Sequence, residues 1–191
     1  MKVRLFSAPW IHNELTDETK EAVEIIGGNI WRDASINFAA ERDFKQREGK
    51  NAPKGMQRFL NEILNERFNN KGWFADSGYY FKETTWVRIT FRHQMSLGSD
   101  ILDALKVCKK EGMEQAIILA ANKATLQLIS PNDANALISF EKLQGEIWSL
   151  NGALDIPLII GELSPLTSAS EEIDFELRKN RPRDITIPIQ N

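Results

Sequence analysis

Two regularly spaced arginines stand out among the residues that could do chemistry. Within the segment Thr85 to Arg92, apolar and polar side chains alternate strictly from Val87 onward. Successive side chains of a β-strand take opposite faces, so Arg88, Thr90 and Arg92 would share one face. Guanidinium groups present a planar fork of hydrogen-bond donors that matches phosphate oxygens. The pattern predicts a polar strand face with two cations, either a solvated surface or a site for an anionic ligand.

Common catalytic motifs are absent from the sequence. It contains no G-x-S-x-G motif, no G-x-x-x-x-G-K-[ST] loop and no G-x-G-x-x-G between a strand and a helix. Two isolated histidines, His12 and His93, and the single Cys108 cannot form a zinc site without several carboxylates. Serine-hydrolase, P-loop and dinucleotide-binding functions are therefore excluded.

Length and composition favour one compact domain over residues 1–191. The chain is 42% hydrophobic and 27% charged, with a formal charge of -3, so any nucleic-acid surface must be local. A lone cysteine cannot form an internal disulfide, and residues 1–10 lack the apolar run of a signal peptide. No stretch is long and apolar enough to span a membrane. We expect a cytoplasmic protein without a membrane partner.

The remaining pattern alternates helices with short apolar strands. Apolar residues recur at helical spacing from Met56 to Phe68, and Ser99 or Asp100 is suited to cap a later helix. Helices are predicted at 16–26, 56–68, 99–110 and 140–150, and strands at 73–81, 85–92, 116–121, 126–129 and 156–160. Residues 29–55 have a weak pattern, in which 36–40 could be helical and 42–54 are predicted to be an exposed connection. These elements predict an α/β sandwich with a mixed sheet, its polar strand face beside the 56–68 helix.

Several segments carry a family resemblance through their order and spacing. They are Lys71-Gly-Trp-Phe74, Trp86-Val-Arg-Ile-Thr-Phe91, 111–118, 140–150 and 156–161, followed by a basic cluster at 178–183. Over about residues 59–161 they resemble the BglII/BstYI group of type II restriction endonucleases. The resemblance implies a PD-(D/E)XK nuclease core at about 55–161 and a tail at 162–191. It also implies a homodimer that binds short palindromic double-stranded DNA in restriction or phage defence, and Mg²⁺-dependent cleavage.

The same resemblance implies where the catalytic carboxylates should be, and those positions hold other residues. The family strand reads apolar, Glu, apolar, Gln or Glu, Phe, which places Arg88 and Thr90 at the two polar positions. The metal-binding Asp of the family falls at Tyr79 or Tyr80. Because Mg²⁺ needs hard anionic oxygens, a guanidinium disfavours the metal and favours phosphate. We therefore predict DNA binding without cleavage.

Relocated carboxylates are the alternative. Glu66, Asp76 and Glu83 could converge as a catalytic group at the same sheet edge, with Asp76 and Glu83 binding Mg²⁺. The chain would then be an active site-specific endodeoxyribonuclease. A third hypothesis is a subunit that keeps the fold and serves as a scaffold for a partner protein.

The resemblance also points to two base-contacting segments. Arg92, His93 and Gln94 follow the polar-faced strand, and a second loop contains Asn132, Asp133 and Asn135. Asn and Gln can pair with adenine edges, and Arg with guanine, in the major groove. Ordinary polar loops are the alternative interpretation.

Overall fold

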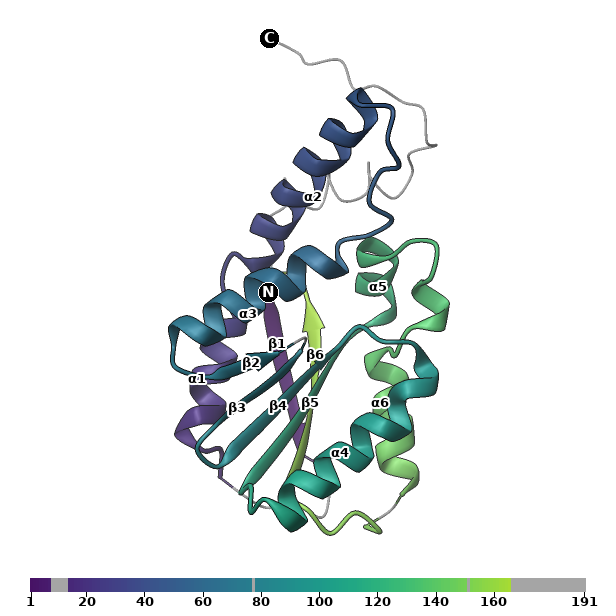
Figure 1. Cartoon of the computed structure of the whole chain (residues 1–191). Helices are drawn as coiled ribbons and strands as arrows, with labels where there is room; N and C mark the ends of the chain where they lie inside the picture. Colours follow the sequence, from purple (N-terminus) through teal and green to yellow (C-terminus); the bar gives the residue numbers. More distant parts are fainter. Residues whose placement is uncertain (8–13, 77, 151, 166–191) are drawn as a thin grey trace.

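A computed structural model describes residues 1–7, 14–76, 78–150 and 152–165. Within these residues, six strands form one sheet in the order β1-β6-β5-β4-β3-β2 (Figure 1). The central strands β4, β5 and β6 are parallel, β1 is antiparallel at one edge, and the β2–β3 hairpin is antiparallel at the other. The strands are β1 Lys2–Ser7, β2 Phe74–Asp76, β3 Tyr79–Lys82, β4 Thr85–Thr90, β5 Gln115–Ala121 and β6 Leu158–Ser164.

Helices cover both faces of this sheet (Figure 1). One core contains Val87 and Ile89 of β4 together with apolar residues of α1, α2, α3 and α5. The other core contains Trp86 of β4 and apolar residues of α4 and α6. The helices are α1 Asp17–Ile26, α2 Ile30–Arg47, α3 Gln57–Asn70, α4 Leu97–Lys110, α5 Lys123–Ile129 and α6 Phe140–Ser149.

Local signals placed several of these elements correctly. Thr16 caps α1 by accepting from the Thr19 N–H at 3.1 Å, and Ser139 caps α6 by accepting from the Lys142 N–H at 3.3 Å. The helices predicted at 16–26, 56–68 and 140–150 and the strand at 116–121 are confirmed within a few residues. Side chains of β4 alternate between the two cores, as predicted.

Two segments were assigned wrongly because their local signal is weak. The connection predicted at 42–54 begins too early, because the long helix α2 continues to Arg47. This helix lacks Gly and Pro and is rich in good helix formers, although only its first turns are buried. The strand predicted at 126–129 is part of α5. Asn122 starts that helix by accepting from the Thr125 N–H at 2.8 Å.

The sheet is also larger than predicted. The strand expected at 73–81 is divided into β2 and β3, and β6 continues to Ser164, beyond the predicted core limit at residue 161. Strand β1 was not predicted, because only Val3 and Leu5 give it an alternating apolar signal, and they pack on the core from the sheet edge. Residues before position 55 therefore belong to the core as well.

Two further sequence expectations concern membrane-spanning segments and the basic cluster near the C-terminus. No helix within the described residues is long and apolar enough to cross a membrane. The basic cluster at 178–183 lies outside the residues that the structure describes.

Candidate functional site

Arg88 lies inside the protein and not on an open strand face. Its side chain is only 2% exposed, and its Nε donates to Asp100 Oδ1 at 3.1 Å. Its guanidinium carbon lies 3.7 Å from the ring centre of Tyr79, the residue opposite it on β3. Thr90 is fully buried. The expectation that this polar face lies beside the 56–68 helix is wrong, because α4 covers the face and supplies Asp100.

Asp100 is shared by two arginines. Its carboxylate is fully buried in the first turn of α4 and also accepts from Arg92 Nη1 at 3.0 Å. The predicted capping role is wrong, because α4 begins at Leu97 and turns Asp100 toward the sheet. Asp100 has the spacing of an apolar position, three residues after Leu97 and four before Ala104. An acidic residue on the apolar side of a helix indicates a buried cationic partner, and sequence reasoning missed this signal.

Arg92 extends from this buried pair to the surface. Its side chain is 41% exposed, and Nη1 also lies 3.4 Å from the Tyr79 hydroxyl. That hydroxyl donates to Asp103 Oδ2 at 3.1 Å. Burial raises the pKa of Tyr79, so its hydroxyl stays a protonated donor near neutral pH. The guanidinium of Arg92 is thus held at the end of β4 with part of its surface open to solvent.

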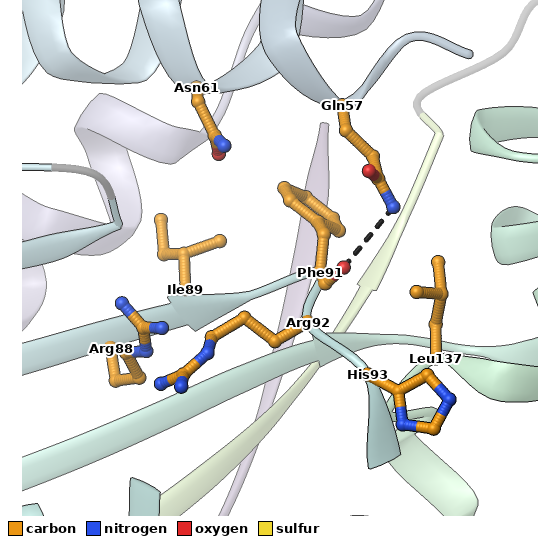
Figure 2. A pocket seen from close by; sticks show the side chains of 8 residues that line it. All are labelled: Gln57, Asn61, Arg88, Ile89, Phe91, Arg92, His93 and Leu137. Carbon is orange, nitrogen blue, oxygen red and sulfur yellow. Dashed lines mark hydrogen bonds between the residues drawn. The ribbon is translucent and has the colours of Figure 1, made fainter. Parts of the chain in front are cut away.

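A hollow of about 370 Å³ opens beside Arg92, between α3 and the end of β4 (Figure 2). Gln57 and Asn61 line it from α3, and Gln57 Nε2 donates to the Phe91 carbonyl at 3.1 Å. Asn61 Oδ1 is buried and has no hydrogen-bond partner within the described residues. The other lining residues are Arg88, Ile89, Phe91, Arg92, His93 and Leu137. This hollow, which we call the β4 pocket, has two arginines and no carboxylate among its described lining residues.

The two segments predicted to contact bases lie side by side at the rim of the β4 pocket. His93 forms a β-bridge with Leu137, and the Ile138 N–H donates to the Arg92 carbonyl at 2.9 Å. Lys142 Nζ donates both to the Gln94 side-chain oxygen and to the Asn135 carbonyl, the latter at 3.2 Å.

The side chains available at this rim are exposed. They are Arg92, His93 and Gln94 from the first segment and Asn132, Asp133 and Asn135 from the second. The fold therefore joins two segments that are about 40 residues apart, and their contact with DNA stays a prediction.

The alternative catalytic carboxylates are not brought together. Asp76 pairs with Tyr79 at one end of β3, whereas Glu83 follows Lys82 at the other end. The strand rise separates these two ends by about 10 Å, whereas two ligands of one metal ion lie within a few ångströms of each other. Glu66 is exposed on α3. The expected convergence at one sheet edge is therefore not found.

Gly78 allows the β2–β3 turn to approach β4 beside Arg88. It has φ +87°, and its carbonyl accepts from the Ile89 N–H at 2.9 Å. A Cβ at this position would lie 2.5 Å from the Ile89 carbonyl oxygen and 3.3 Å from Arg88 Nη1. Both the backbone conformation and the close contact require glycine.

Gly78→Ala is expected to destabilise the protein by roughly 1–3 kcal/mol, because the new Cβ meets rigid backbone at a positive φ. Urea unfolding followed by circular dichroism measures this change. Gly98→Ala is the control, because nothing lies within 4 Å of its added Cβ and residue 98 is helical. Equal stability of the two variants would show that the turn does not need glycine.

The fold is a restriction-endonuclease-like α/β fold, with a mixed sheet, helices on both faces and a hairpin before the parallel strands. The predicted fold class is therefore confirmed. The structure is similar to the crystal structure of restriction endonuclease BglII complexed with a DNA 16-mer. The TM-score is 0.54 and the identity 16%, over 86% of this chain and 79% of that chain. Free BglII gives a TM-score of 0.46 at 14% identity, over 86% and 80% of the two chains. No protein-family model matches the sequence, and no curated protein matches it.

Proposed function

We propose that this chain binds double-stranded DNA as a homodimer and does not cut it at the β4 position where the restriction-endonuclease group carries carboxylates. The observation that carries the proposal is the cluster in which Arg88 and Arg92 share Asp100. The similar BglII structure contains DNA, and its fold likeness supports the same class of ligand here. Restriction or phage defence is the proposed setting.

The residues around Arg88 do not fit Mg²⁺. Mg²⁺ binds through oxygen ligands in near-octahedral geometry, and carboxylates supply its negative charge. The carboxylate oxygen that Arg88 contacts, Asp100 Oδ1, already accepts from two guanidinium groups. Within the described residues, no three His, Cys, Asp or Glu side chains are grouped so that they could hold a metal ion. The side chains around Arg88 therefore do not support metal-dependent cleavage at this position.

Arg92 is the proposed phosphate contact. Its exposed surface offers donors in a fixed fork, and Asp100 holds that fork in place. Arg88 is too deeply buried for a direct contact with the DNA backbone and instead orients Asp100. The proposed contact with the DNA backbone is therefore made by Arg92, at the end of β4, and not by Arg88.

A plasmid assay with Mg²⁺ or Mn²⁺, run beside a gel shift on linear duplex DNA, tests the proposal. The expected result is a shift without cutting, with an affinity that falls steeply as salt rises, because phosphate contacts release counterions. Chelator-sensitive cutting that Asp76→Ala or Glu83→Ala abolishes would establish relocated catalysis instead. A protein that neither shifts nor cuts DNA would match the scaffold hypothesis.

A further inference from the structure

Helix α2 extends away from the sheet and past α3 (Figure 1). Its buried residues all lie in its first turns. Further along the helix, Ile36 is 55% exposed and Phe44 is 50% exposed, although both are large and apolar. Most helices in proteins are stabilised by packing an apolar face against another element. One apolar face of α2 lacks such a partner within the described part of the chain.

The exposed residues of α2 form one stripe along the helix. Ile36, Ala40 and Phe44 follow one another at intervals of four residues, so they lie on the same side. Asp33 and Arg47 extend this side by three residues at each end. Ala40 and Arg47 are exposed, and the Asp33 side chain is 44% exposed. We call these five residues the α2 stripe.

The α2 stripe is complementary to itself about Ala40. If two copies of α2 pack antiparallel around a two-fold axis beside Ala40, residues equally far from Ala40 on its two sides meet. Ile36 then meets Phe44 of the second copy, and Asp33 meets Arg47 of the second copy. The small side chain of Ala40 lets the two helices approach, so that the larger apolar side chains on either side of it can interdigitate.

The charges select the antiparallel direction. A parallel pair would place Asp33 beside Asp33 and Arg47 beside Arg47, and such like-charge contacts are destabilising. Both residues can take a new partner. Asp33 Oδ2 accepts from Arg67 Nη2 at 2.9 Å, and a carboxylate has further lone pairs for a second donor. Arg47 donates only to the Asp43 carbonyl among the described residues, which leaves most of its guanidinium donors available.

We propose that two copies of this chain pair through the α2 stripe, antiparallel about Ala40. The inference rests on the homodimer of the proposed function and names its interface. A single pair of helices buries less than the ~1,600 Å² of a standard interface, so we expect a dissociation constant on the order of 10 µM. The ion pairs at the two ends of the stripe are exposed, so pairing should weaken as salt rises.

Sedimentation velocity across the micromolar range measures this association. Phe44→Asp should weaken it by about tenfold or more, because each copy loses an apolar contact and places a carboxylate against Ile36. Phe74→Asp is the matched control, because Phe74 is 54% exposed and lies on β2, away from the α2 stripe. This variant should keep the dissociation constant of the wild-type chain. Circular dichroism melting checks that both variants fold.

Disulfide cross-linking tests the register without relying on a destabilising change. In a Cys108→Ala background, which removes the single native cysteine, Ala40→Cys should form a disulfide with its own copy under oxidation. Ile36→Cys and Phe44→Cys should cross-link when the two variants are mixed, and neither should cross-link alone. A parallel pair would give the reverse pattern and would overturn the proposed arrangement.

The same samples separate this inference from the proposed DNA binding. A chain that stays monomeric, or a dimer that Phe44→Asp leaves intact and that forms no disulfide at position 40, would overturn pairing through the α2 stripe. A gel shift with duplex DNA by that chain would still support the proposed DNA binding. Conversely, a dimer that cross-links at position 40 but shifts no duplex would overturn the proposed DNA binding and support the α2 interface.

Discussion

Asp100→Ala is expected to lower the free energy of unfolding by about 3–5 kcal/mol, the usual loss when one partner of a buried ion pair is removed. The carboxylate is fully buried, and Arg88 beside it is 2% exposed. Without Asp100, the Arg88 guanidinium loses the carboxylate to which its Nε donates, in a place that water hardly reaches. Urea unfolding at neutral pH measures the change.

Two further variants separate the ion pair from packing. Asp103→Ala removes a partly buried acid that accepts one hydrogen bond from Tyr79, so a loss of only about 1 kcal/mol is expected. The double variant Arg88→Met with Asp100→Leu should be more stable than Asp100→Ala, because apolar pairs often replace buried ion pairs without loss. Asp100 Oδ2 is buried without a partner among the described residues, which makes this recovery easier. A loss below 1 kcal/mol for Asp100→Ala would contradict the proposed role of the pair.

Arg92→Glu is expected to weaken duplex binding by about tenfold or more and to reduce the slope of log affinity against log salt by about one. The change removes an exposed phosphate donor and places a negative charge at the end of β4. Fluorescence anisotropy with a labelled duplex at several salt concentrations measures both quantities. Arg88→Glu is less informative, because a second carboxylate beside buried Asp100 would unfold the protein.

Lys20→Glu provides the matched charge reversal. Lys20 is exposed on α1 and pairs only with exposed Asp17 among the described residues. Lys20→Glu changes the net charge of the protein by the same amount as Arg92→Glu, but it should leave duplex affinity within about twofold. If both variants weaken binding equally, the effect is one of total charge and the end of β4 is not the binding surface.

Many of the helices and strands of the α/β domain could be predicted from local patterns, whereas the restriction-endonuclease-like fold was predicted from the family resemblance. The caps at Thr16 and Ser139, the apolar stripe of α3 and the apolar run of β5 depend on residues close together in the chain, so they are readable in the sequence. Helix α2 and strand β1 escaped prediction for the opposite reason. Each buries few residues, and β1 also depends on pairing with β6, which is far away in the sequence.

The sequence by itself determined which side chains are available at the end of β4: two arginines, a histidine and amides, with no carboxylate at the two family positions. Only the tertiary structure decided what those side chains do. The packing of α4 on the sheet gives Arg88 and Arg92 a common buried partner, and the pairing of β2 with β3 keeps Asp76 away from Glu83. Charge is a property of each residue, whereas burial and the distance between charges arise only when separate elements pack together.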